Sequence, residues 1–258
     1  MKCGYFFSNF FVPFSSSGYS LKCLSFVVVS KEYGAIIFDT GSPFKPEEVL
    51  NQLKDYFDLF PEDIKWVFTT HCHPDHVGAN GFFKRAKFIF SKRDFDFAEE
   101  VAEVALSEKS LLNFLFDRCP GYVENFDETE ERNIKYYVKN FWSRENLGLN
   151  YSRSFMEDNP EIPEFIKPFE TFGHTHFHYS FNLISSVNNF FVTGDSVSNR
   201  LILKNELKER LLEPHMDFEN YFKTVDFFKK QSGIVIPGHD RPFNISDSIP
   251  IKTKIFEI

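Results

Sequence analysis

The chain has 258 residues, 42% of them hydrophobic, which is enough to build one large domain with a substantial core. Its formal net charge of -8 is spread without a basic block or an acidic tail, so we expect neither a nucleic-acid partner nor a membrane-surface partner. The four cysteines are too few and too widely spaced for a disulfide framework, and no apolar stretch is long enough to cross a bilayer. These features favour a cytoplasmic protein with reduced cysteines.

The first forty residues predict an antiparallel sheet. Apolar runs at 5–14, 23–30 and 35–40 are separated by the turn signals SSSGYS and KEYG. Residues 44–60 then carry apolar side chains at helical spacing behind a proline and two glutamates, which predicts a helix. The next run, IKWVFTT at 64–70, predicts a buried strand that ends where the histidine-rich segment HCHPDH begins.

The character of the chain changes between about residue 92 and residue 160. This part holds helical patterns such as FAEEVAEVALSEKSLLNFLF and no convincing strand, so we expect a helical insertion within a single domain spanning 1–258. Strands resume with FNLISS and NNFFVTGD, and a helix is predicted at 216–231. The run GIVIPGHD predicts a last strand followed by a loop. The 35 phenylalanines indicate an aromatic core.

Histidines and aspartates gather where the apolar runs end, at HCHPDH and at His174, Asp195 and His239. Strand ends present side chains to a common cleft, and imidazoles with carboxylates are the ligands of zinc and similar cations. His71 and His73 lie two residues apart in an extended segment, so they project to the same side and can reach one ion. Asp75 and His76 follow at a turn and are aimed at a second ion, and Cys72 faces inward.

The run His71-Cys72-His73-Pro74-Asp75-His76 resembles the HxHxDH signature of the metallo-β-lactamase superfamily. That family's other motifs have counterparts in the same order: Asp39-Thr40-Gly41, Gly173-His174-Thr175, Gly194-Asp195 and Pro237-Gly238-His239. The matching motifs span about residues 20–243, and their shared order is more specific than HxHxDH alone. The resemblance implies an α/β fold of the α+β kind, a four-layer αββα sandwich of two mixed β-sheets with helices outside.

The resemblance also implies a centre of two divalent metal ions, for which we favour zinc over iron or manganese. The family's ligand positions correspond to His71, His73 and His174 for one ion, to Asp75, His76 and His239 for the other, and to Asp195 as the bridge. Asp75 and Asp195 would also be the catalytic carboxylates. Asp39 and His178 are expected to support the ligands from behind. His215 is expected at a helix start or on the surface.

The implied activity is hydrolysis, in which a hydroxide bridging the ions attacks an ester, lactone, thioester or phosphoester bond of a small molecule. Asp195 stands where many β-lactamases have cysteine, which argues against antibiotic hydrolysis, and Ser198 stands where quorum-quenching lactonases often have tyrosine. Three alternatives stay open: an iron-dependent oxidoreductase of the persulfide-dioxygenase kind, a nuclease of the same superfamily, and a binding protein without catalysis.

The helical insertion leads to two competing hypotheses. It could overhang the metal ions and line a substrate pocket with aromatic side chains, for which we select Tyr122, Phe141 and Trp142, with Phe95 and Phe114 as further lining. It could equally form the surface of a homodimer, because exposed apolar helices commonly mark partner contacts.

Overall fold

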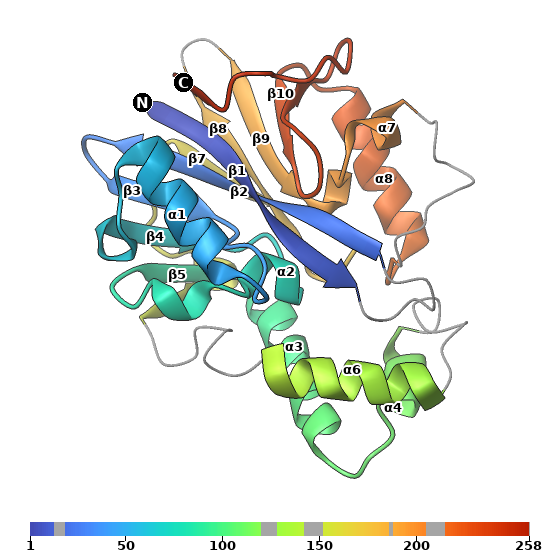
Figure 1. The fold of residues 1–258 in the computed structure, drawn as a ribbon. Helices are drawn as coiled ribbons and strands as arrows, with labels where there is room; N and C mark the ends of the chain where they lie inside the picture. The colour runs from blue at the N-terminus through green and yellow to red at the C-terminus, as the bar shows by residue number, and fades with distance from the viewer. Residues whose placement is uncertain (13–18, 120–127, 142–151, 186–187, 205–214, 258) are drawn as a thin grey trace.

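The structure, a computed structural model, describes residues 1–12, 19–119, 128–141, 152–185, 188–204 and 215–257 (Figure 1). Its strands form two mixed sheets, one with the order β12-β1-β2-β3-β4-β5-β6 and one with the order β11-β10-β9-β8-β7. The first sheet contains β1 Lys2–Val12, β2 Tyr19–Ser30, β3 Gly34–Phe38, β4 Ile64–Phe68, β5 Lys87–Phe90, β6 Arg153–Phe155 and β12 Ile255–Glu257. The second contains β7 Ile166–Glu170, β8 Tyr179–Ile184, β9 Asn189–Gly194, β10 Ile234–Pro237 and β11 Phe243–Asn244.

Strand direction changes within each sheet. In the first sheet β12, β1, β2 and β3 pair antiparallel, whereas β3, β4, β5 and β6 pair parallel. In the second sheet only the β9–β10 pair is parallel. The carboxyl ends of β3, β4 and β5 therefore meet at one edge of the first sheet, and those of β9 and β10 meet at one edge of the second.

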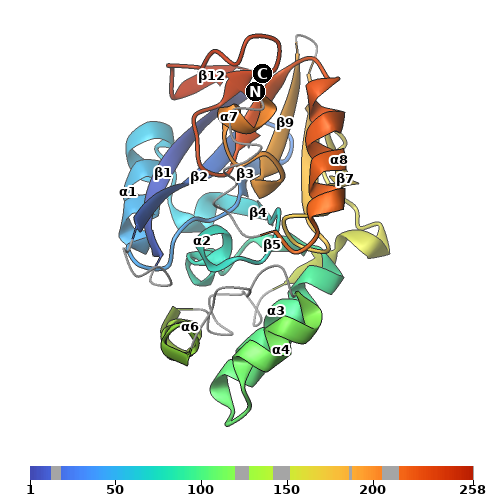
Figure 2. The same ribbon diagram turned by 90° about the vertical axis from the view of Figure 1, so that its right-hand side faces the viewer.

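Helices cover the outer faces of both sheets, with α1 on the first sheet and α8 on the second (Figure 2). α1 begins at a proline with two glutamates in its first turn, which suit the positive end of a helix. The helices are α1 Pro46–Phe57, α2 Pro74–Val77, α3 Lys92–Leu106, α4 Leu111–Arg118, α6 Glu128–Phe141, α7 Arg200–Leu203 and α8 Phe218–Lys229. Single 3₁₀ turns lie at Pro61–Asp63, Asn80–Phe82, Met156–Asp158 and Asp195–Val197.

Three layers of apolar side chains hold the four layers of backbone together. Between the sheets, the rings of Phe38, Phe68 and Phe181 lie with their centroids 5.2 to 5.4 Å apart. A second layer fills the space between the first sheet and its helices, and a third joins α8 to the second sheet. Alternate residues of β2 serve different layers, with Phe26 facing the other sheet and Val27 facing the helices. The predicted αββα sandwich is confirmed.

Helices α3, α4 and α6 lie beside one another at one end of the molecule, within the predicted insertion (Figure 1). The expectation that residues 92–160 hold no strand is wrong, because β6 falls inside this range and pairs parallel to β5. A strand of three residues, with the sequence RSF, is too short to show alternation. Among the residues that the structure describes, no helix combines the length and apolarity needed to span a membrane.

Candidate metal centre

The histidine-rich segment follows β4 directly and turns into α2. His73 is extended, with φ -65° and ψ 147°, and Pro74 opens the helix at its first position. His71 and His73 therefore lie on the loop, whereas Asp75 and His76 lie in the single turn of α2. β4 pairs in parallel with β3 on one side and β5 on the other, so its carboxyl end is held between them. The loop is therefore anchored at the edge of the sheet.

The other three residues come from loops of the second sheet. His174 lies between β7 and β8, Asp195 follows β9, and His239 follows β10. The two parallel strands place their loops side by side, and the amide of Gly238 donates to the carbonyl of Gly194 at 2.9 Å. Glycine is required at 238, because a Cβ atom there would overlap the carboxylate of Asp195. The Pro-Gly-His motif thus lets this carboxylate approach the main chain.

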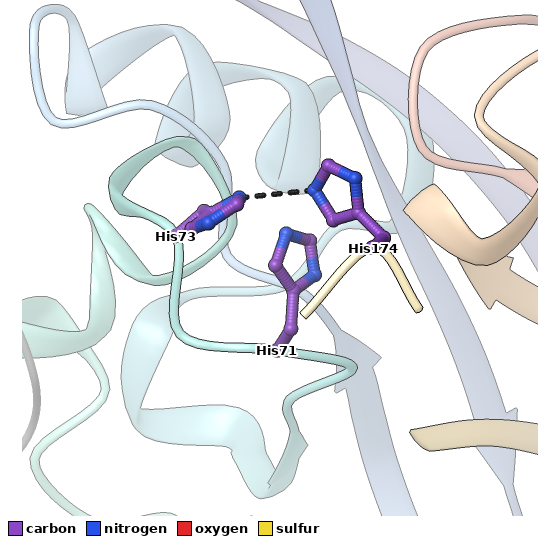
Figure 3. A group of neighbouring side chains, drawn as sticks. All are labelled: His71, His73 and His174. Atoms are coloured by element: carbon purple, nitrogen blue, oxygen red, sulfur yellow. Dashed lines mark hydrogen bonds between the residues drawn. The ribbon is translucent and has the colours of Figure 1, made fainter. Parts of the chain in front are cut away.

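All seven predicted ligand residues come together where the two sheets meet. The donor atoms of His71, His73 and His174 lie within 4.8 Å of one another, and Figure 3 shows these rings turned toward each other. His174 Nε2 lies 3.1 Å from His73 Nδ1. Two further sets of donor atoms are equally close: His71 with His76 and Asp195, and Cys23 with Asp75 and His239.

Asp195 lies between these groups. Its Oδ2 is 3.0 Å from His239 Nε2 and 3.4 Å from His174 Nε2, while its Oδ1 is 3.5 Å from His76 Nε2. One carboxylate thus faces the histidines of both proposed ion sites. This is the position that a bridging ligand needs.

Four of the histidines are each held in place by a contact at Nδ1, the ring nitrogen other than Nε2. The Nδ1 atoms of His71 and His76 are bound by Thr70 Oγ1 at 3.1 Å and by Asp39 Oδ2 at 2.9 Å. The carbonyl of Lys22 holds His239 Nδ1 at 3.1 Å. His174 Nδ1 lies 3.2 Å from His215 Nδ1. The oxygen partners of His71, His76 and His239 accept from Nδ1, so that Nε2 of each ring faces the cluster, as in a metal-ligating imidazole.

Three buried atoms in the cluster have no hydrogen-bond partner among the described residues: His71 Nε2, His76 Nε2 and Asp195 Oδ1. Each such atom costs about 1–3 kcal/mol when it is left unpaired. Because all three face the same small space and are nitrogen or oxygen donors, divalent ions fit the residues present. These atoms without a hydrogen bond are the strongest indication of a metal site here.

The charges of the cluster also suit a cation. Burial lowers the pKa of His71 and of His174 well below the usual value, so both are neutral and can donate a lone pair. Burial also opposes the charged form of Asp195, but His239 and His76 hold the pKa of that carboxyl well below its usual value. Asp75, Asp195 and Asp39 outweigh burial at His76 and raise its pKa well above the usual value. An excess of carboxylate charge therefore surrounds His76.

Asp39 and His178 lie behind the ligands. Asp39 has a φ of 54°, a strained value for a residue other than glycine, and its carboxylate accepts bonds from the Thr70 amide and hydroxyl, each at 2.8 Å. It thereby fixes both the loop and His76. His178 stacks on His71 at 4.9 Å, and its Nδ1 lies 3.0 Å from Thr171 Oγ1. Burial lowers the pKa of His178 to about 3.

His215 lies just before α8, whose N-cap is Asp217, which agrees with the expected helix start, but it is not on the surface. Its exposed fraction is 0%, its Nδ1 lies 3.2 Å from His174 Nδ1, and its ring stacks on Tyr221 at 3.6 Å. The amides of Met216 and Asp217 donate to the carbonyls of His174 and Gly173, which draws this segment inward. Sequence reasoning missed the role of His215, because the contact joins residues 41 positions apart.

Cys23 is the second functional candidate that sequence reasoning missed, since the cysteines were expected only to be reduced. The structure places its thiol 3.1 Å from Asp75 Oδ2. Cys72, by contrast, packs inward into the apolar layer between the first sheet and its helices, as expected. All four cysteines are free and buried.

The proposed substrate pocket is tested only in part. Tyr122 and Trp142 lie outside the described residues, as does the side chain of Phe141, the last residue of α6. Phe95 does not line a pocket, because it is 1% exposed and packs against Phe90 at 5.1 Å. Phe114 is partly buried and stacks on Phe97 at 6.2 Å. The apolar spacing of the sequence at these two positions fits core packing as well as it fits the lining of a pocket.

Comparison with known sequences points to one family. A family model described as the metallo-beta-lactamase superfamily matches residues 19–89. A probable metallo-hydrolase of Methanocaldococcus jannaschii is 37% identical over 62 residues, which are 24% of this chain and 30% of that protein. The mouse metallo-beta-lactamase domain-containing protein 1 is 38% identical over 58 residues, 22% of each chain. The chain thus matches less than a third of the length of either relative.

Solved structures resemble the chain over nearly its whole length. AidC, a dizinc quorum-quenching lactonase in complex with a product, has a TM-score of 0.64 at 17% identity, with 92% of this chain and 85% of that chain covered. AbOPH, a hydrolase in the beta lactamase superfamily, has a TM-score of 0.62 at 20% identity, with 98% and 93% covered. At such identities the likeness establishes the fold. The family model and both relatives carry the metallo-beta-lactamase or metallo-hydrolase description, so the chain is similar to that superfamily in sequence over residues 19–89 and in fold over nearly its whole length.

Proposed function

We propose that this protein is a hydrolase that depends on two divalent ions, zinc in the first instance, and cleaves an ester, lactone, thioester or phosphoester bond of a small molecule. The observation that carries the proposal is the set of three unpaired buried atoms, His71 Nε2, His76 Nε2 and Asp195 Oδ1. In our assignment one ion is held by His71, His73 and His174, the other by Asp75, His76 and His239, with Asp195 shared.

Ions bound there would acidify a water molecule toward a pKa of about 7 and polarise the bond under attack. The chain's own residues prepare the site for this. Asp39 and Thr70 orient two of the histidines. Asp195 Oδ2 faces one histidine of each group, and its Oδ1 faces His76. Asp75 and Asp195 supply negative charge that offsets the charge of the ions, and both are buried among rings that keep bulk water out.

The structural neighbours support hydrolysis without naming the substrate. AidC is a lactonase by its description, and AbOPH is a hydrolase. The neighbours do not narrow the bond that this chain cleaves beyond the four proposed classes, which are ester, lactone, thioester and phosphoester. A small-molecule substrate is in keeping with a net charge of -8, which repels polyanions such as nucleic acids.

The proposal is tested by metal analysis combined with a substrate panel. Purified protein should contain about two zinc ions per chain, and the zinc-replete enzyme should hydrolyse at least one class of ester, lactone, thioester or phosphodiester. The same preparation stripped by a chelator, then reloaded, is the control, since activity should disappear and return. Iron in the isolated protein with oxygen uptake would instead support the oxidoreductase. Failure to bind any divalent ion would overturn the metal centre.

A further inference from the structure

Cys23 is buried beside the residues assigned to the second ion. Its exposed fraction is 0%, and its Sγ lies 3.1 Å from Asp75 Oδ2. The donor atoms of Cys23, Asp75 and His239 all lie within 4.8 Å of one another, as close as the three histidines of the first group. Sulfur, oxygen and nitrogen donors thus converge on one side of the centre, whereas the other side has nitrogen donors and the shared carboxylate.

The main chain holds Cys23 in this place on both sides. The amide of Leu24 donates to the carbonyl of Gly238 at 2.7 Å, and His239 Nδ1 bonds to the carbonyl of Lys22 at 3.1 Å. The residues before and after Cys23 are therefore tied to the loop that carries His239. On its other edge β2 pairs with β1, where Cys23 lies opposite Ser8. The position of the sulfur is set by these strands and does not depend on its hydrogen bond to Asp75.

A second observation at the same place points to a bound ion. His76 Nε2 has no hydrogen-bond partner among the described residues, although its side chain is only 1% exposed. This nitrogen lies 3.5 Å from Asp75 Oδ2, the oxygen atom that faces the thiol of Cys23. His239 Nε2 lies 3.6 Å from the same oxygen. A carboxylate oxygen surrounded by two imidazole nitrogens and a sulfur is an arrangement that a borderline cation satisfies.

We propose that Cys23 is a thiolate ligand of the second ion, together with Asp75, His76 and His239. This inference rests on the proposed metal centre. When the ion binds, the S–H bond of Cys23 breaks, its proton passes to solvent, and the sulfur electron pair forms the bond to the metal, with no change in oxidation state. The hydrogen bond to Asp75 is lost, which frees that oxygen for the ion.

This ligand makes the two sites chemically unequal. Thiolate favours zinc and cobalt over manganese and magnesium, whereas imidazoles with a carboxylate accept a wider range of ions. We expect the second site to be the more selective of the two. The competing explanation is that Cys23 is a structural thiol that only donates to Asp75 and packs against Phe10.

Cobalt substitution separates the two explanations without measuring activity. The metal-free full-length protein is titrated with Co²⁺, and its absorption spectrum is recorded. If Cys23 binds the ion, a sulfur-to-cobalt charge-transfer band appears in the near ultraviolet, beside the ligand-field bands in the visible region. Cys23→Ser should remove the charge-transfer band, keep the visible bands, and weaken zinc binding at the second site by at least about tenfold.

Cys72→Ser is the matched control, because Cys72 is also buried and adjacent to ligands but packs into the apolar layer. It should keep the band. Visible bands without a charge-transfer band in the wild-type protein would overturn the role of Cys23 and leave the metal centre standing. Absence of all cobalt bands and of zinc binding would overturn both. If Cys23→Ser does not fold, X-ray absorption of the wild-type zinc protein decides, since the proposal requires one sulfur neighbour among the zinc ligands.

Discussion

The metal centre and the group of helices α3, α4 and α6 are stabilised in different ways. The residues of the centre lie on loops from both sheets that are bonded to the other sheet, as the bond from the Leu24 amide of β2 to the Gly238 carbonyl illustrates. The helices contribute buried apolar side chains to the layer beside the first sheet. Their polar contacts join the helices to one another, with Glu131 accepting from the Leu111 amide at 2.6 Å and Arg118 paired with Glu100 near the surface at 3.0 Å. Exposed pairs of this kind contribute little, typically 0–1 kcal/mol each.

This difference determines how far the effects of a substitution in each region extend. A change in the centre alters several bonds at once, because four of the proposed histidine ligands are each held by a further residue. A change in the helices has local effects. The two regions meet at His176, which stands two residues after His174. Its Nε2 lies 3.3 Å from the Arg118 carbonyl and 3.8 Å from the thiol of Cys119. The end of α4 therefore adjoins the centre without contributing a ligand.

The largest effect is expected from Asp195→Ala. This substitution removes the carboxylate that faces both histidine groups, so both ions should be lost and turnover should fall to background. Zinc content per chain and hydrolysis of the best substrate in the panel are the measurements. Retention of about two tightly bound ions would show that Asp195 is not the bridge.

His239→Ala should have a smaller and one-sided effect. His239 contacts Asp75 and Asp195, and its ring lies beside that of His76, which is assigned to the same ion. Zinc content should fall to about one ion per chain, with the first site still filled. His71→Ala is the matched comparison, because it should empty the first site. Equal loss of both ions from His239→Ala would contradict this division.

The sequence predicted the residues of the centre better than its surroundings, for a physical reason. Each ligand directly follows or closely flanks a strand, and strands with long apolar runs can be recognised locally. Cys23 and His215 reach the centre through contacts with residues 52 and 41 positions away in the sequence. The contact of Cys23 depends on the register of the sheet, and that of His215 depends on the entry into α8. No local pattern encodes either. Strand β6 was missed because three residues are too few to show the alternation of apolar and polar side chains.

His215→Ala tests whether a residue beyond the ligands controls metal affinity. His215 Nδ1 lies 3.2 Å from His174 Nδ1 and so holds the ring of His174 with Nε2 toward the cluster. Loss of such a partner commonly weakens metal binding by about 10–100-fold. Zinc affinity of the first site is measured by competition with a chelating dye. His176→Ala serves as the control, and an equal loss there would argue against a specific role of His215.

His215 also predicts how acid affects the metal-free protein. Burial lowers its pKa to about 4, whereas the unfolded imidazole takes up a proton near pH 6.5. Between these values acid favours the unfolded chain, so stability should fall with falling pH by up to about 1.4 kcal/mol per unit from this residue. Denaturant unfolding at pH 7.5, 6 and 5 measures the slope. His215→Phe keeps a ring against Tyr221 and should reduce the slope; an unchanged slope would exclude His215 as its source.

The smallest effect on the metals is expected from Trp142→Ala, in the region of the helices. Trp142 lies outside the described residues, and its proposed role as pocket lining rests on the sequence and on the approach of α4 to the centre at His176. The substitution should change KM or the order of preference among substrates, while zinc content and the pH profile stay as in the wild type. A lower molecular mass in solution with unaltered kinetics would instead assign the helices to a homodimer contact. Loss of zinc would contradict both readings, because it would mean that the helices and the metal centre are stabilised together.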